Sequence, residues 1–168
     1  CCSDNSELCN TADRYGIPFL RLNKEFADLS DSNIILQLLA WAEKHPGVHL
    51  YGSLPCTVWS SWQYMAINKG GATYINRLRK RRQQSMHMFD NFVALARKVV
   101  ELGGSVSFEW PRHCYGWVQP KVMRFVEEFS LSEALFDGCS FGLTHNHHPV
   151  HKPWRVVTTN GLLANNLS

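Results

Sequence analysis

Short apolar segments alternate with longer amphipathic segments along this chain, and this alternation constrains its fold more than any other feature. The apolar segments predict strands at residues 17–22, 48–54 and 105–110, with two more near residues 134–137 and 154–159. A helix between two strands returns the chain to the same end of a sheet. The alternation therefore predicts an α/β fold, doubly wound around a mostly parallel sheet.

The helices between these segments have recognisable ends. Helices are predicted at residues 7–15, from Asp31 or Ser32 to about 45, from about 74 to 102, and at 120–129. Pro46 and Gly47 end the second helix, and Pro120 suits the first position of the last one. A chain of 168 residues predicts a single domain over residues 1–168. Since the chain begins at Cys1 without Met, we expect a fragment lacking the start of its first strand and some C-terminal elements.

Charge and cysteine content narrow the classes of protein. The chain has 17 basic and 14 acidic residues, a net charge of +3, and no apolar run near the ~20 residues that span a bilayer. We therefore expect no membrane partner. Its six cysteines are too irregularly spaced for a disulfide scaffold, which favours a reducing compartment, cytoplasmic or nuclear. One basic cluster, residues 77–82, holds five positive charges and is either an exposed helix face or a phosphate contact.

Two reactive side chains follow or end predicted strands. Cys56 comes after the strand at residues 48–54, where Pro55 restricts the turn, and Glu109 lies near the end of the strand at residues 105–110. Loops at the carboxyl ends of parallel strands converge, so residues 3–6, 54–60 and 109–116 should meet. A thiol placed there is a potential nucleophile. The alternatives are a buried structural cysteine and a structural ion pair of Glu109 with an arginine.

Four segments occur in a fixed order: "ADLSD" at residues 27–31, "SLPCTVWS" at 53–60, "SFEWPRHCYGW" at 107–117, and "FDGCSFGL" followed by "HKPWRVVTTN" between 136 and 160. In this order they resemble the cytosine-5 DNA methyltransferases and their shorter phage and mobile-element relatives. The resemblance implies a Rossmann-like methyltransferase fold and transfer of a methyl group from S-adenosylmethionine to carbon 5 of cytosine in DNA. By this resemblance Cys56 attacks carbon 6, Glu109 hydrogen-bonds the base, and Arg155 helps to hold the cytosine and the catalytic loop.

The same resemblance implies further contacts. Cofactor contacts are expected at Ser3, Asp4, Asn5, Ser6, Asp28 and Pro55. Nucleic-acid contacts are expected at Ser60, Trp62, Arg77, Arg81, Arg112 and Lys152, with aromatic rings near residue 62 stacking on an unpaired base. A base in duplex DNA reaches such a pocket only by flipping out of the stack.

Three other interpretations stay open. The segment "CCSDNS" lacks the glycines of the family's first loop, so the chain can also be a catalytically inactive nucleic-acid-binding module of a mobile-element polyprotein. A hydrolase with Cys56 as nucleophile and His113 as base is a further candidate. Four histidines at residues 145, 147, 148 and 151 raise the possibility of zinc, but their spacing favours a solvated loop, and no metal site is predicted.

Overall fold

A computed structural model describes residues 7–23 and 27–168. The helices are α1 (Glu7–Arg14), α2 (Ser32–Lys44), α3 (Trp62–Glu101), α4 (Pro120–Glu128) and α5 (Gly161–Leu167). The strands are β1 (His49–Gly52), β2 (Ser105–Pro111), β3 (Ser132–Asp137), β4 (Thr144–His145), β5 (His148–Pro149) and β6 (Pro153–Thr158). Three short 3-10 helices are η1 (Thr57–Trp59), η2 (Tyr115–Val118) and η3 (Gly138–Phe141).

The main sheet corrects the predicted topology. Its four strands run in the order β1-β2-β6-β3; β1 and β2 are parallel, and β6 is antiparallel to both of its neighbours. The prediction of a doubly wound, mostly parallel, Rossmann-like sheet is therefore wrong. Only a 3-10 helix and a small hairpin separate β3 from β6, so no helical crossover returns the chain to the starting end, and the two strands pair antiparallel.

The apolar segment at residues 17–22 also differs from its prediction. It forms no strand, and Ile17, Phe19 and Leu20 are exposed. Its first amide, that of Ile17, donates to the carbonyl of Ala12 at 2.8 Å and so closes the end of α1 instead of joining the sheet. A further strand was expected at the very start of the chain, with Cys1 and Cys2 as its last residues. These residues lie outside the described part of the chain.

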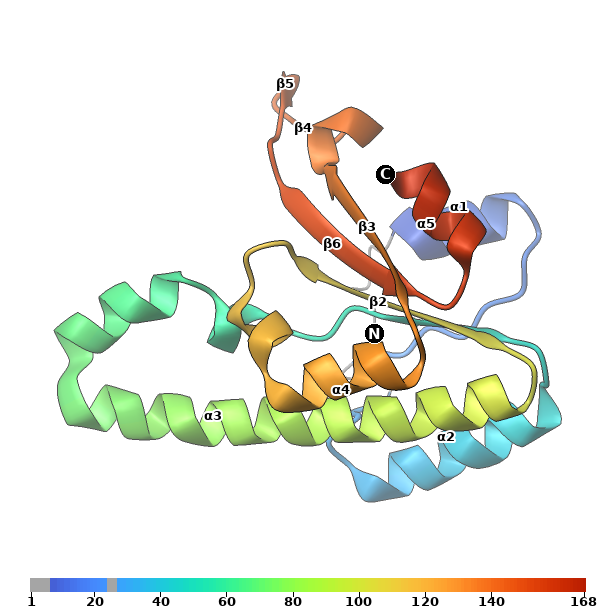
Figure 1. The fold of residues 1–168 in the computed structure, drawn as a ribbon, viewed down its shortest axis with the longest axis horizontal. Helices are drawn as coiled ribbons and strands as arrows, with labels where there is room; N and C mark the ends of the chain where they lie inside the picture. Colours follow the sequence, from blue (N-terminus) through green and yellow to red (C-terminus); the bar gives the residue numbers. More distant parts are fainter. Residues whose placement is uncertain (1–6, 24–26) are drawn as a thin grey trace.

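Strand direction still gathers several loops at one edge of the sheet. Because β1, β2 and β3 run the same way and β6 runs against them, the carboxyl ends of three strands share an edge with the amino end of β6. The segments after Gly52, Pro111 and Asp137 and the segment before Pro153 therefore leave the sheet together (Figure 1).

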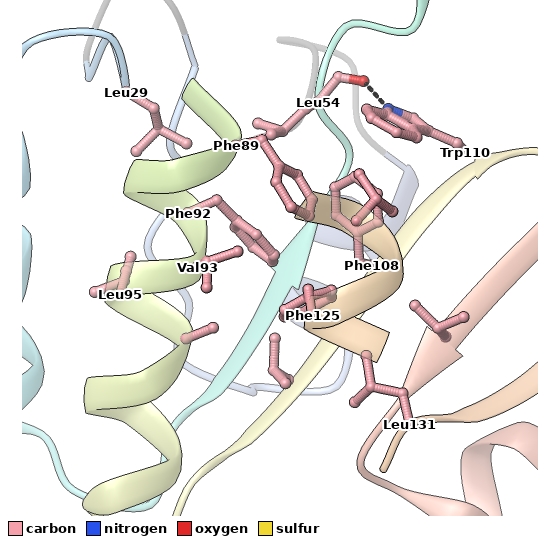
Figure 2. Close-up of a cluster of buried hydrophobic side chains, with 14 of the residues drawn as sticks. Leu29, Leu54, Phe89, Phe92, Val93, Leu95, Phe108, Trp110, Phe125 and Leu131 are labelled. Atoms are coloured by element: carbon pink, nitrogen blue, oxygen red, sulfur yellow. Dashed lines mark hydrogen bonds between the residues drawn. The ribbon is translucent and has the colours of Figure 1, made fainter. Parts of the chain in front are cut away.

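Helices cover the two faces of the sheet unequally. Figure 1 shows α3 and α4 on one side and α5 on the other. Facing α3 and α4, Phe108 on β2 packs against Phe89, Phe92 and Phe125 with ring centroids 5.3–6.2 Å apart (Figure 2). These four rings are almost completely buried, so burial of aromatic surface on this face provides the main hydrophobic stabilisation of the sheet.

The helix α3 is two helices joined at a bend. Gly71 has φ 57° and ψ −157°, a backbone conformation that residues other than glycine rarely adopt. A short first limb, residues 62–70, therefore folds back against a long second limb, residues 72–101 (Figure 1). The predicted helix from about 74 to 102 corresponds to the second limb.

Candidate active site at the edge of the sheet

Cys56 is held in a loop whose backbone is fixed from several sides. The carbonyl of Leu54 accepts a hydrogen bond from Trp110 Nε1 at 2.7 Å, which ties the loop to β2 (Figure 2). The carbonyl of Cys56 accepts from the amide of Trp59 at 2.9 Å and starts η1, and Trp59 Nε1 donates to Ser85 Oγ on α3 at 2.8 Å. The thiol of Cys56 is half-buried and occupies a fixed position just beyond β1.

Glu109 lies on the face of the sheet opposite the aromatic core. In β2 its neighbours Phe108 and Trp110 point to α3 and α4, so Glu109 points the other way. One carboxylate oxygen accepts a hydrogen bond from the Tyr51 hydroxyl, and the other accepts from Ser53 Oγ at 2.8 Å. Tyr51 is in β1, and Ser53 follows the strand two residues later. Together the two donors hold the carboxylate in one orientation.

The charges around Cys56 show which groups gather near the thiol. Burial raises the pKa of Cys56, a hydrogen bond from the backbone and the positive charge of Lys152 lower it, and the negative charge of Glu109 raises it. Cys56 is thus close enough to Glu109 and Lys152 to interact with both charges. Because burial dominates, the resting thiol is protonated at neutral pH, and a reaction at sulfur requires loss of that proton.

A second thiol lies near the first. Cys114 is buried in the loop after β2, and burial raises its pKa to about 11, with a contribution from the neighbouring Cys56. Cys114 therefore stays protonated across the physiological range and is not a competing nucleophile.

Arg155 does not join this group. On β6 it pairs with Trp110, whereas Glu109 pairs with Val156, and paired residues share a face of the sheet. The side chain of Arg155 is therefore on the side of α3 and α4, where it forms an ion pair with Glu133 and lies 4.5 Å above the ring of Trp117. The sequence resemblance placed Arg155 beside the base, but the side chain is already engaged on the opposite face.

The residues predicted to bind the cofactor are only partly described. Ser3, Asp4, Asn5 and Ser6 lie outside the described residues. Asp28 Oδ1 accepts hydrogen bonds from Ser30 N at 2.9 Å and Ser30 Oγ at 2.8 Å in the turn before α2, and Pro55 is exposed. The two described contacts, Asp28 and Pro55, do not by themselves form a cradle for S-adenosylmethionine.

The predicted nucleic-acid contacts divide between the sheet edge and α3. Lys152 and Arg112 are exposed at the edge, where Lys152 Nζ lies 4.2 Å from the ring centre of Trp154 and the Arg112 amide donates to Pro153. Ser60 Oγ accepts from the amide of Trp62 at 3.3 Å at the start of α3. Arg77 and Arg81 are exposed on the second limb of α3.

Some residues of this site were not anticipated from the sequence. Tyr51 and Ser53 orient Glu109, and Tyr115 packs edge-on against Tyr64 with ring centroids 5.4 Å apart. Alternation along β1 was the available signal for the first two, because Tyr51 and Ser53 lie two residues apart and so share a face. Nothing local in the sequence indicates the contact of Tyr64 with Tyr115.

The other candidates from the sequence are His113 as a catalytic base and the histidine loop as a metal site. His113, the proposed base of a hydrolase, is exposed in the turn after β2. Within residues 7–23 and 27–168, no group of three or more histidine, cysteine or acidic side chains is arranged to hold a metal ion. His151 Nε2 instead lies 3.2 Å from Asp137 Oδ1.

The helices of the described segments include none long and apolar enough to cross a membrane.

A separate groove of about 300 Å³ lies between α3 and α4. Phe89 and Phe125 contribute apolar surface to it, and ion pairs Arg97–Glu128 and Lys121–Asp90 connect the two helices there. Its lining includes neither Cys56 nor Glu109, so this groove is not part of the candidate active site.

Comparison with known proteins identifies no relative of this chain. No protein-family model matches the chain, and neither curated proteins nor solved structures give a match. The residues of the site and the sequence resemblance are therefore the basis of the function proposed below.

Proposed function

We propose that Cys56 and Glu109 form the base-binding centre of a DNA (cytosine-5-)-methyltransferase. The proposal is supported above all by one observation: two groups far apart in the chain, a thiol and an oriented carboxylate, lie at one edge of the sheet, where the negative charge of Glu109 raises the pKa of Cys56. The methyl donor implied by the resemblance is S-adenosylmethionine, which supplies an electrophilic methyl group when bound.

The chain's own residues account for activation of the base. Cys56 loses its proton to solvent water, a loss that the positive charge of Lys152 favours, and its sulfur bonds to carbon 6 of cytosine. The electrons of the 5,6 double bond shift toward carbon 5, which becomes nucleophilic. Glu109, held by Tyr51 and Ser53, accepts a hydrogen bond from the exocyclic amine and fixes the ring over the sulfur.

This chemistry has a test that requires no methyl donor. When carbon 5 takes a proton from water and the original hydrogen leaves, elimination of Cys56 restores cytosine with its hydrogen exchanged. We expect the protein to release tritium from oligonucleotides labelled at carbon 5 of cytosine. Cys56→Ser should abolish release, and Glu109→Gln should slow it by about 100-fold, the scale of losing one oriented polar contact in a reaction.

The controls separate chemistry from folding. Cys139→Ser changes another half-buried thiol outside the proposed site and should leave release unchanged. No tritium release by the unmodified protein over a range of pH and sequences, or equal release by Cys56→Ser, would refute the proposed covalent step.

A nucleic-acid-binding module without catalysis is the second candidate function. The observation that favours it is the raised pKa of Cys56, because a thiol protonated at rest is a poor nucleophile. Such a module binds oligonucleotides but exchanges no hydrogen. Binding and tritium release measured on the same sample distinguish the two functions.

A reducing compartment, cytoplasmic or nuclear, is part of the proposal. Cys9, Cys56, Cys114 and Cys139, the cysteines in the described part of the chain, are free thiols. A disulfide at Cys56 would consume the nucleophile, so the proposed activity needs reducing conditions.

A further inference from the structure

We propose that the helical arm, residues 62–82 of α3, binds single-stranded nucleic acid and presents an unpaired base to the site at Cys56. The arm includes the first limb of α3, the bend at Gly71 and the start of the second limb. Its binding role stands independently, whereas presentation of a base to Cys56 rests on the function proposed above.

The root of the arm is fastened to the loop that contains Cys56. In the first limb, Gln63 Nε2 donates to the carbonyl of Thr57 at 2.8 Å, and Gln63 Oε1 accepts from the Tyr74 hydroxyl of the second limb at 2.5 Å. Arg82 donates to the carbonyl of Val58 at 3.0 Å and lies 5.1 Å above the ring of Trp59. A ligand bound along the arm is therefore guided toward the residues that follow Cys56.

The arm has a net positive charge, whereas the rest of the chain has a net negative charge. Residues 62–82 contain six of the 17 basic residues and no acidic one, and the nearest acidic residues in sequence are Glu43 and Asp90. The remainder of the chain has 11 basic and 14 acidic residues, so its net charge is negative. Concentrating the positive charge on one projecting element favours a polyanion as the partner.

The basic side chains of the arm are open to solvent. Lys69, Arg77, Arg79, Lys80 and Arg81 are exposed. Arg77 and Arg81 are four residues apart and lie on the same side of the second limb, one turn from each other. None of these five side chains has an acidic neighbour within the arm, so they are available to pair with successive phosphates.

Exposed aromatic rings on the arm and beside it favour a single strand over a duplex. Trp62 is 72% exposed, and Tyr64 and Tyr115 are 49% and 47% exposed. Tyr115 is the first residue of η2, which follows β2, so the Tyr64–Tyr115 pair connects the first limb of α3 to the segment after Glu109. A base stacks on such a ring only when its face is free, and duplex bases bury their faces against each other.

Binding measured by fluorescence anisotropy tests this inference. We expect a labelled single strand of about 12 nucleotides to bind at least ten-fold more tightly than the matching duplex in about 0.1 M salt. Anisotropy reports binding without the covalent step, so single-strand binding without tritium release would mean that the proposed chemistry fails while this inference holds. Failure of the proposed chemistry and failure of this inference are thereby distinguished.

Paired variants locate the contact. The double variant Arg77→Ala/Arg81→Ala should weaken single-strand binding by about 10-fold or more at about 0.1 M salt and reduce the slope of log affinity against log salt by about 1.4. The double variant Lys44→Ala/Arg124→Ala removes the same charge from exposed residues of α2 and α4 and should change binding by less than about two-fold.

The aromatic contact has its own matched pair. Trp62→Ala should weaken single-strand binding by about ten-fold without changing the salt slope, because stacking is uncharged. Leu36→Ala removes an exposed apolar side chain of α2, 65% exposed, and should have no effect.

Three outcomes would overturn the inference. They are duplex binding as tight as single-strand binding, arm variants that bind like their controls, and preferential binding of the arm to vesicles of anionic phospholipid. Because Arg77, Arg81 and Trp62 are exposed, their substitution should leave the thermal unfolding midpoint unchanged, and circular dichroism checks this.

Discussion

The two faces of the main sheet contrast sharply although the same strands make both. Facing α3 and α4 are Leu50 and Gly52 of β1 and Val106, Phe108 and Trp110 of β2. Facing away are Tyr51 of β1 and Ser107 and Glu109 of β2, with Ser107 buried in a hydrogen bond to Thr158. Along β2, successive residues therefore alternate between stabilising the fold and providing polar groups.

This contrast shows how a small sheet supports a reactive site without losing stability. The aromatic face fixes the positions of β1 and β2, and the polar face can then carry a carboxylate that contributes little to stability. Trp110 connects the two functions, because its ring is in the core and its Nε1 holds the Cys56 loop through Leu54. The sizes of the mutational effects on the two faces test this division of roles.

The largest expected effect comes from replacing Phe108, which is fully buried against the rings of Phe89, Phe92 and Phe125. Phe108→Ala should lower the free energy of unfolding by about 4 kcal/mol because it leaves a cavity in the core. Its neighbour on the other face gives the control: in Glu109→Gln the amide oxygen accepts from one of the hydroxyls of Tyr51 and Ser53 and the amide nitrogen donates to the other, so the change should cost about 1 kcal/mol or less. Urea denaturation measures both, and equal losses would contradict the division between the faces.

A methyl group added at Gly52 should have the next largest effect. A Cβ at this position would lie 2.5 Å from a ring atom of Phe92 and 3.0 Å from one of Phe108, and neither ring has room to move. Gly52→Ala should therefore lower the free energy of unfolding by about 2 kcal/mol. At Gly161 a Cβ meets nothing within 4 Å, so Gly161→Ala should be neutral or slightly stabilising. A harmless Gly52→Ala would show that the aromatic face is loosely packed.

The smallest effect concerns the charges at the edge of the sheet. Since Lys152 lowers and Glu109 raises the pKa of Cys56, Lys152→Gln should raise that pKa and slow alkylation by iodoacetamide, whereas Glu109→Gln should lower it and speed alkylation. We expect changes of a few-fold between about pH 7 and 10, measured by mass spectrometry of the peptide that contains Cys56.

The neighbouring thiol provides the internal reference for that experiment. With a pKa of about 11 and a buried side chain, Cys114 should react much more slowly in every variant. Identical alkylation of Cys56 in Lys152→Gln and Glu109→Gln would mean that neither charge acts on the thiol.

Local patterns in the sequence were sufficient for most elements of the structure. The predicted helices at residues 7–15, 32–45 and 120–129 match α1, α2 and α4 closely, and the strands near residues 48–54, 105–110, 134–137 and 154–159 match β1, β2, β3 and β6. Caps, prolines and apolar periodicity are properties of neighbouring residues, so they can be read without knowledge of distant contacts. The first limb of α3, which follows the Cys56 loop directly, was not predicted.

The candidate site was predicted in part for the same reason. The resemblance and the strand ends indicated Cys56 and Glu109, and the shared direction of β1 and β2 brings them to one edge despite the wrong sheet topology. The placement of Arg155 failed because it depends on how β6 pairs with β2, a contact between residues more than forty positions apart. Its partners Glu133 and Trp117 are 22 and 38 positions away in sequence.

The sequence alone determined where most helices and the strands of the main sheet lie, that a thiol follows one strand and a carboxylate lies near the end of another, and that positive charge is concentrated between residues 62 and 82. Tertiary structure decided that β6 runs antiparallel between β2 and β3, which side of the sheet Arg155 occupies, and that Tyr51 and Ser53 orient Glu109. The physical reason is that backbone propensity acts over a few residues, whereas strand order and side-chain partners are settled by the burial of surfaces from distant parts of the chain.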